Sequence, residues 1–382
     1  MKAKKTEGYL RVKRTSLNYV NTMKLGDTPG VYMKEKGENS PSLYGSYHAL
    51  HILDMFGELD KYSEEDLDQW ASFFLEKQCE QGYFSNNPSD FKKVRTLREL
   101  DPVLHNTRGM IWALRILKRK PKRPFKFMES ALNAQVLYDW VKSYDWSNSW
   151  AAGNQVCAIA TILFAMRDWF GVSEVDKIMK EGMYPALEEL LDANTGYWGT
   201  QLGSDLLNAQ FGTIHITPIY FAQGWPLRAL ERNVDSTLAC QLPDGSFWPG
   251  GSDCPDFDGA YMMINLAQLT DYRKEDLKEA ARKYLKHALT HEDFNGVGWL
   301  LHRKDSKPSD WKPRPHFLWV DGEDQARAEL RDEDPARTHI MLGSWFYPLS
   351  IALVAYMLGD TGYEGPYNLN PESLHECNVC KF

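Results

Sequence analysis

A short acidic segment contains the residues best suited to proton transfer. It reads Asp253-Cys254-Pro255-Asp256-Phe257-Asp258 and opens an apolar stretch of the chain. Burial without a partner is costly for a carboxylate and raises the pKa of a carboxyl group, which can then donate a proton near neutral pH. We therefore predict that Asp258 and Asp256 are catalytic acids. For Asp256, capping of the following helix is the competing interpretation.

Other polar residues occur where further apolar segments begin, and some lie inside those segments. We predict that two histidines, His105 and His339, are also catalytic, because imidazole exchanges protons near neutral pH. Arginine forms forked hydrogen bonds to carboxylates and phosphates, and aromatic faces stabilise cations or stack on sugars. Burial with an ordinary hydrogen bond is the alternative for the histidines. The predicted substrate contacts are His48, Arg108, Asn154, His215, Tyr261, Arg337 and Trp345.

The segments that carry these residues have helical periodicity and are of two alternating kinds. One kind is apolar nearly all round, which predicts burial on every side; the other is charged on one face. We expect a segment near 14–25 to supply a further charged helix. The predicted buried helices are 47–56, 104–117, 154–170, 208–222, 257–269 and 340–358, and the predicted surface helices are 64–78, 127–142, 173–191, 226–241 and 274–291.

A turn motif recurs where the surface helices end. Residues 78–84 and 241–247 read Q-x-x-x-G-x-aromatic, residues 192–198 differ only in the first position, and 295–299 is a degenerate copy. A drifted copy is expected near 146–150. Glycine ends each helix in a conformation that other residues resist, and the aromatic residue fills the seam between hairpins. We therefore predict an all-α fold, an (α/α)6 toroid of alternating inner and outer helices.

The predicted toroid is one domain over 1–382. Residues 300–336 form an insertion without clear periodicity, rich in Pro, Asp, Arg and Trp, which we interpret as a flap over one end of the ring. Residues 360–382 are expected to be an irregular tail. They contain Cys377 and Cys380, which have the spacing of half a zinc site, although a plain tail explains them more simply.

The repeated turns resemble those of the terpenoid cyclase and protein prenyltransferase superfamily, over roughly residues 40–360. The resemblance implies an α/α toroid. Asp256-Phe257-Asp258 is similar to the first three positions of the D-x-D-D acid motif of class II terpene cyclases, which implies that Asp258 is the general acid. Gly259 replaces the last aspartate of that motif, and the prenyltransferase zinc ligands are not matched in spacing by Asp253 and Cys254.

Three functions follow from this sequence. The first is a cyclase-like isomerase or lyase that protonates an isoprenoid or other polyene in an aromatic-lined cavity. The second is a carbohydrate-active lyase, hydrolase or epimerase that acts on an acidic saccharide, because such enzymes also use α/α toroids. The third is a toroid without catalytic activity that binds a small molecule or a protein.

Composition narrows the expected partners. The formal net charge of −8 disfavours nucleic acid and anionic membrane surfaces, and no apolar run reaches the length of a membrane span. We expect a small-molecule substrate with an anionic group, because arginines and helix N-termini favour one. No metal site or other cofactor is predicted, with zinc and magnesium left open, and the oligomeric state is not predicted. Scattered cysteines and a start without a signal peptide favour the cytoplasm.

Overall fold

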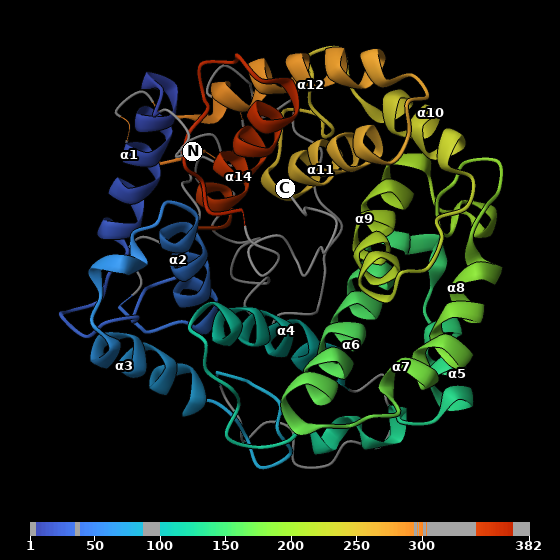
Figure 1. Ribbon diagram of the computed structural model, residues 1–382, viewed down its shortest axis with the longest axis horizontal. Coiled ribbons are helices and arrows are strands. Elements are labelled where there is room, and N and C mark those ends of the chain that lie inside the picture. Colours follow the sequence, from blue (N-terminus) through green and yellow to red (C-terminus); the bar gives the residue numbers. More distant parts are fainter. Residues whose placement is uncertain are drawn as a thin grey trace.

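The inner layer of the protein is a closed ring of apolar helices (Figure 1). The computed structural model describes residues 5–34, 39–86, 100–293, 296, 298–300, 303 and 341–369. Each inner helix contacts the next along the chain, and the last contacts the first. The inner helices of this described part are α2 (Leu43–Met55), α4 (Asp101–Ile116), α6 (Ser149–Phe170), α9 (Leu206–Gln223), α11 (Asp253–Leu269) and α14 (Met341–Leu358).

Amphipathic helices form the outer layer and cover the ring. Among them, α1 supplies the sixth outer element that the sequence placed near 14–25. The predicted (α/α)6 toroid is therefore confirmed. The outer elements are α1 (Glu7–Thr22), α3 (Glu64–Leu75), α5 (Ala134–Lys142), the interrupted helix α7 (Val175–Ile178), η6 (Met179–Met183) and α8 (Tyr184–Leu190), then α10 (Leu230–Cys240) and α12 (Lys274–Ala288).

Short 3-10 turns account for the main differences from the predicted helix bounds. The predicted helix at 127–142 is divided: η4 (Lys126–Ala131) comes first, and α5 begins only after Asn133, whose side chain accepts a hydrogen bond from the Val136 N–H. An asparagine cap of this kind starts a helix by satisfying a free backbone donor. The other 3-10 turns among the described residues are η1 (Leu59–Lys61), η5 (Trp146–Asn148), η7 (Thr200–Leu202) and η8 (Leu289–His291).

The repeated glutamine of the turn motif links each hairpin to the next outer element. The Gln78 Nε2 donates to the carbonyl oxygens of Gly82 at 2.9 Å and Arg123 at 2.8 Å. Gln241 repeats this arrangement with the carbonyl oxygens of Gly245 at 3.1 Å and Ala280 at 2.8 Å. Each glutamine therefore donates to carbonyl oxygens of two consecutive hairpins. These oxygens would be costly to bury without a hydrogen bond.

The glycine of the motif is required by both conformation and space. Gly245 has φ +93°, and a Cβ at this position would lie 2.5 Å from the Lys283 carbonyl oxygen. The drifted copy expected near 146–150 is the turn at η5. It lacks the glycine, but Trp146 is buried and donates from its indole N–H to the Val141 carbonyl, as Trp198 does to that of Leu187.

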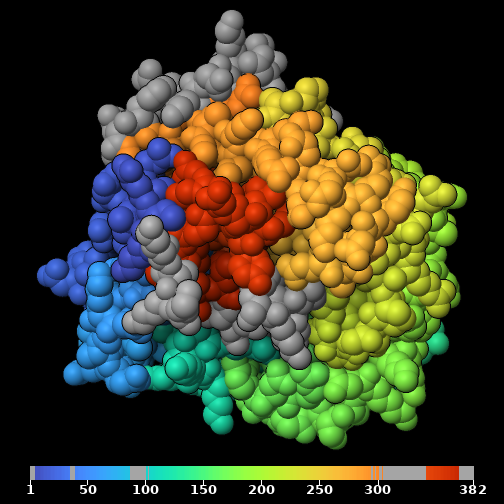
Figure 2. Space-filling model, turned by 45° about the horizontal axis from the view of Figure 1, so that its top comes forward, coloured from blue at the N-terminus to red at the C-terminus, as the bar shows by residue number. Residues whose placement is uncertain are grey.

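The ring is closed between the two ends of the chain. Helix α14 contacts α1 and α2 on one side and α11 and α12 on the other, and its place between these segments is visible on the surface (Figure 2). The Thr6 N–H donates to the Glu364 carbonyl oxygen at 3.1 Å, so that the two ends of the described chain meet. Residues 360–369 are irregular as expected, whereas 304–340, most of the predicted flap, and the pair Cys377/Cys380 lie outside the described residues.

Two inner helical segments are long and apolar enough to cross a membrane. They are Trp146–Phe170 and Met341–Leu358, and 94% and 83% of their most apolar windows are buried inside the protein. Their hydropathy is explained by their position in the inner layer, where each is covered by neighbouring helices.

Candidate functional site

A pocket opens between three neighbouring inner helices. Three of the predicted site residues line it, namely Asp258, His215 and Tyr261. Among the described residues its lining is Cys157 of α6, Ile214, His215 and Pro218 of α9, and Asp258 and Tyr261 of α11. Its free volume is about 20 Å³, which is room for about one water molecule. This is far below the volumes usual for ligand pockets, about 300–1,000 Å³, so the described lining receives a single group of a ligand, such as a hydroxyl group, rather than a whole sugar unit.

The imidazole of His215 is held in one orientation by its own helix. Its Nδ1 lies 2.6 Å from the Phe211 carbonyl oxygen, so the Nδ1–H donates there and Nε2 keeps its lone pair. Burial, together with the nearby positive charge of Arg108, lowers the pKa of His215 to about 3. His215 is therefore neutral at physiological pH and acts toward a ligand as a hydrogen-bond acceptor.

Arg108 is a buried cation for which the described residues supply no counter-charge. Its side chain is 3% exposed, its NH1 donates to the Asn154 carbonyl oxygen at 3.3 Å, and its guanidinium lies 4.8 Å from the centre of the Trp112 ring. Within the part of the chain that the structure describes, its Nε has no hydrogen-bond partner. An unpaired buried charge is unfavourable, and an anionic ligand would relieve that cost.

Other buried polar atoms on the inner helices also lack partners within the described chain. They include the Asn154 Oδ1, both amide atoms of Gln210 and the Tyr261 hydroxyl. Asn154 is the residue whose main-chain oxygen accepts from Arg108, and Tyr261 lines the pocket. Buried polar groups are nearly always hydrogen-bonded in native proteins, so a group of exceptions on one layer indicates that something else binds them.

Three further predicted residues lie on the inner layer but outside this pocket lining. His48 is buried, with Nδ1 2.9 Å from the Tyr44 carbonyl oxygen. His105 lies on α4, one turn before Arg108, and Trp345 lies on α14 with its ring stacked on that of His51. Arg337 and His339 lie outside the described residues.

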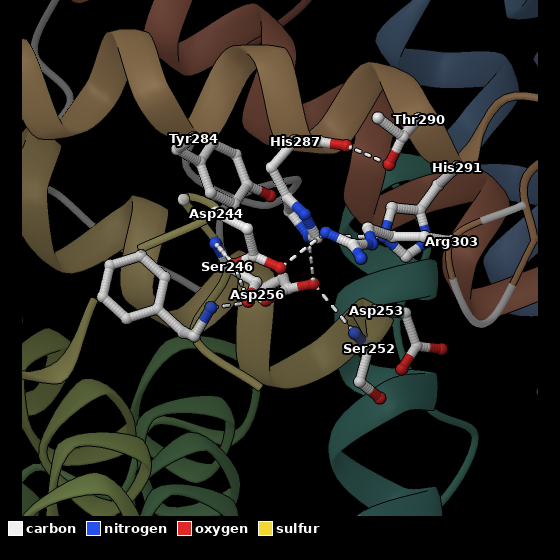
Figure 3. Close-up of polar contacts among 12 residues, drawn as sticks. Asp244, Ser246, Ser252, Asp253, Asp256, Tyr284, His287, Thr290, His291 and Arg303 are labelled. Atoms are coloured by element: carbon white, nitrogen blue, oxygen red, sulfur yellow. Dashed lines mark hydrogen bonds and ion pairs between the residues drawn. The ribbon is translucent and has the colours of Figure 1, made fainter. Parts of the chain in front are cut away.

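Asp256 lies on the opposite side of α11 from Asp258, because two residues on a helix are about 200° apart. Its carboxylate faces the outer layer, where Oδ2 is 2.8 Å from the Nε2 of His287 on α12 (Figure 3). Its Oδ1 accepts the Phe247 N–H at 2.7 Å. The sequence prediction grouped Asp256 with Asp258, whereas the structure separates them into a buried polar cluster and the pocket.

Sequence reasoning missed the histidines of that cluster and one other buried histidine, His51. His287 and His291 are four residues apart in the predicted surface helix 274–291, a spacing that places two histidines on one helical face and could have drawn attention to them. His51 stacks on Trp345 at 4.4 Å between ring centres, and neither of its nitrogens has a partner among the described residues. It lies one turn after His48, in a helix that is buried throughout.

We expect His51 to make the protein less stable as the pH falls. Burial lowers the pKa of His51 from 6.5 to about 3, so between these values the unfolded chain binds a proton that the folded chain does not. The free energy of unfolding should then fall with decreasing pH by about 1.4 kcal/mol per pH unit on account of this residue. The effect is absent above about pH 6.5 and complete near pH 3.

This expectation is checked by denaturant unfolding of the wild type and of His51→Phe at about pH 7, 6, 5 and 4, across the window that linkage defines. The variant should show the shallower decline, by the amount stated above for each pH unit. Equal slopes for the two proteins would show that His51 is not a buried neutral group.

Comparison with known proteins gives distant similarities. No family model and no curated protein matches the chain. The GH76A α-1,6-mannanase of Salegentibacter sp. HEL1_6 aligns at 11% identity and a TM-score of 0.48, covering 98% of this chain and 100% of that one. A glycosyl hydrolase of family 88 from Bacteroides vulgatus aligns at 13% identity and a TM-score of 0.49, covering 93% and 99%. A polysaccharide lyase aligns at 12% identity and a TM-score of 0.46, covering 92% and 98%.

These identities are too low to assign an activity, and the function must be argued from the site. The structure contains the toroid that the repeats predict. The narrower resemblance to terpenoid cyclases and prenyltransferases stays a prediction.

Proposed function

We propose that this protein is a carbohydrate-active enzyme that acts on an acidic saccharide, with one reacting group of the sugar at the pocket between α6, α9 and α11. The observation that carries this proposal is the buried guanidinium of Arg108, which has no carboxylate partner within the described residues. Arginine binds carboxylates through two parallel hydrogen bonds, so a uronic acid supplies the missing anion.

The remaining polar groups favour a sugar over a polyene. Asn154, Gln210 and Tyr261 offer amide and hydroxyl atoms on the same layer that no other described residue pairs. Sugar hydroxyl groups can satisfy such atoms. A hydrocarbon ligand would leave them unpaired in an apolar environment, at a cost of about 1–3 kcal/mol for each group.

In this proposal Asp258 is the proton-transferring residue. It lines the pocket together with the neutral imidazole of His215, whose Nε2 accepts a hydrogen bond from a sugar hydroxyl. Arg108 fixes the acidic sugar by its carboxylate, and Asp258 exchanges a proton with the reacting oxygen or carbon. His105, one turn before Arg108 on α4, is a second candidate for proton transfer.

The test is a comparison of three groups of ligands with the purified full chain. Oligosaccharides that contain a uronic acid should bind and be converted. The same compounds with the carboxyl group reduced to an alcohol should bind at least about tenfold more weakly, because a charge-assisted hydrogen bond is worth about 1.5–3 kcal/mol. Calorimetry measures the binding and mass spectrometry the products. Conversion of isoprenoid diphosphates instead would refute the saccharide and favour the cyclase.

A further inference from the structure

A second group of chemically capable residues lies between the two layers of the toroid, away from the pocket. It consists of Asp256 on α11, His287 on α12 and His291 in η8, and all three side chains are buried. One oxygen or nitrogen atom from each lies within 4.8 Å of the others. Figure 3 shows His287 reaching from the outer helix toward the carboxylate, with His291 beside it.

The spacing of the two histidines in this cluster fits a bound metal ion. The two imidazole Nε2 atoms are 3.3 Å apart, and the Asp256 Oδ2 is 2.8 Å from the Nε2 of His287. A tetrahedral zinc ion with Zn–N bonds of about 2.0–2.1 Å holds its ligand atoms about 3.3–3.4 Å apart. The histidine pair already has this separation, and the carboxylate needs to withdraw by about 0.5 Å to admit the ion.

Both histidines can present a lone pair to the same point. The Nδ1 of His291 lies 3.1 Å from the Leu300 carbonyl oxygen, so its N–H donates there and its Nε2 is unprotonated. The Nδ1 of His287 is buried without a partner among the described residues, so the proton can reside on Nδ1 and leave Nε2 available to a metal. Without a metal, the Nε2 of His287 must carry that proton to donate to Asp256.

The surroundings hold the three side chains in place. The Ser252 N–H donates to the Oδ2 of Asp256 at 2.8 Å, and the Tyr347 hydroxyl of α14 lies 3.3 Å from the Nε2 of His291. Hydrogen bonds from neighbouring groups to the ligating side chains hold metal ligands in a fixed orientation. Gly251 closes one side of the cluster with its backbone, since a Cβ there would collide with the Nε2 of His291.

We propose that Asp256, His287 and His291 bind one zinc ion, which fastens the outer helix α12 to the inner layer. Two imidazoles and one carboxylate are zinc-ligand types, and imidazole disfavours magnesium and calcium. The site is buried and faces away from the pocket, which gives the ion a structural rather than a catalytic role. A water molecule completes the four ligands.

The experiment uses the full chain with Cys377 and Cys380 replaced by serine, which removes the other pair of zinc-ligand residues. The protein is stripped with a chelator, reconstituted with Zn²⁺ alone, and analysed for bound metal and for its unfolding temperature. We expect one zinc per chain and an unfolding temperature several degrees higher with Zn²⁺ but not with Mg²⁺. His287→Ala and His291→Ala should each weaken zinc binding at least about 100-fold, whereas His51→Ala, another buried histidine, should leave it unchanged.

Reconstitution with Co²⁺ keeps the test decisive if a variant does not fold. The wild-type side chains should give the intense visible absorption of four-coordinate cobalt with nitrogen ligands. The proposal is overturned if the chain with Cys377→Ser and Cys380→Ser binds no zinc, if the double variant His287→Ala/His291→Ala binds it as tightly, or if the cobalt spectrum is that of a six-coordinate ion.

Discussion

Turnover of the acidic saccharide is expected to fall by about 10²–10⁴-fold when Asp258 is replaced by asparagine, the range typical for loss of an acid–base group. The amide side chain keeps the shape of the carboxyl group but cannot exchange a proton in its place. The substitution sits at a pocket-lining position of α11, so the fold should persist. Steady-state rates on the saccharide identified by the ligand comparison provide the measurement, with circular dichroism as the check on folding.

Asp271→Asn is the matched control, because Asp271 follows the same helix and its side chain is 94% exposed. It should retain the wild-type rate. A folded Asp258→Asn protein with full activity would remove Asp258 from the chemistry and leave His105 as the remaining described candidate for proton transfer.

Loss of the guanidinium at position 108 should weaken ligand binding without lowering the stability of the fold. Arg108→Leu is expected to weaken binding of the acidic saccharide by about 10- to 100-fold, the equivalent of one or two charge-assisted hydrogen bonds. Binding of the carboxyl-reduced saccharide should change much less, because that ligand has no anion to lose. Removal of an unpaired buried charge should also leave the free energy of unfolding unchanged or raised.

Arg115→Leu serves as the control on the same helix. Its guanidinium pairs with Asp168 at 3.0 Å near the other end of α4, so saccharide binding should be unaffected. Calorimetry with both ligands and denaturant unfolding give the two measurements. Equal weakening for the acidic and the reduced ligand, with a loss of stability, would show that Arg108 supports the fold rather than the substrate.

The fold could be predicted from the sequence because its signals are strong and repeated. Six segments without a polar face must be buried on every side, and a glycine turn at regular spacing divides them from amphipathic helices. The predicted segment 208–222 corresponds to α9 (Leu206–Gln223), and 257–269 to α11 (Asp253–Leu269). The bounds of the outer helices were harder to predict. Periodicity alone predicts one helix over 127–142, whereas the cap at Asn133 starts a new helix there.

The site was less predictable, because it depends on the direction in which each side chain points from its helix and not only on its position in the sequence. Asp256 and Asp258 are two residues apart, yet helical geometry sends one carboxylate to His287 and the other to the pocket. Nothing in the local sequence tells which side of α11 faces the interior of the ring. The pairing of His287 and His291 with Asp256 depends on the packing of α12 against α11, which only the assembled layers define.

Closure of the ring by its last helix has a consequence for how the protein is made. Helix α14 follows every other inner helix in the chain and fills the gap between α11 and α2. Because a ribosome synthesises the chain from the N-terminus, residues 341–358 emerge last among the inner helices. Until they emerge, the apolar faces of α11 and α2 that pack on α14 stay uncovered. The ring therefore cannot close before residues 341–358 are available.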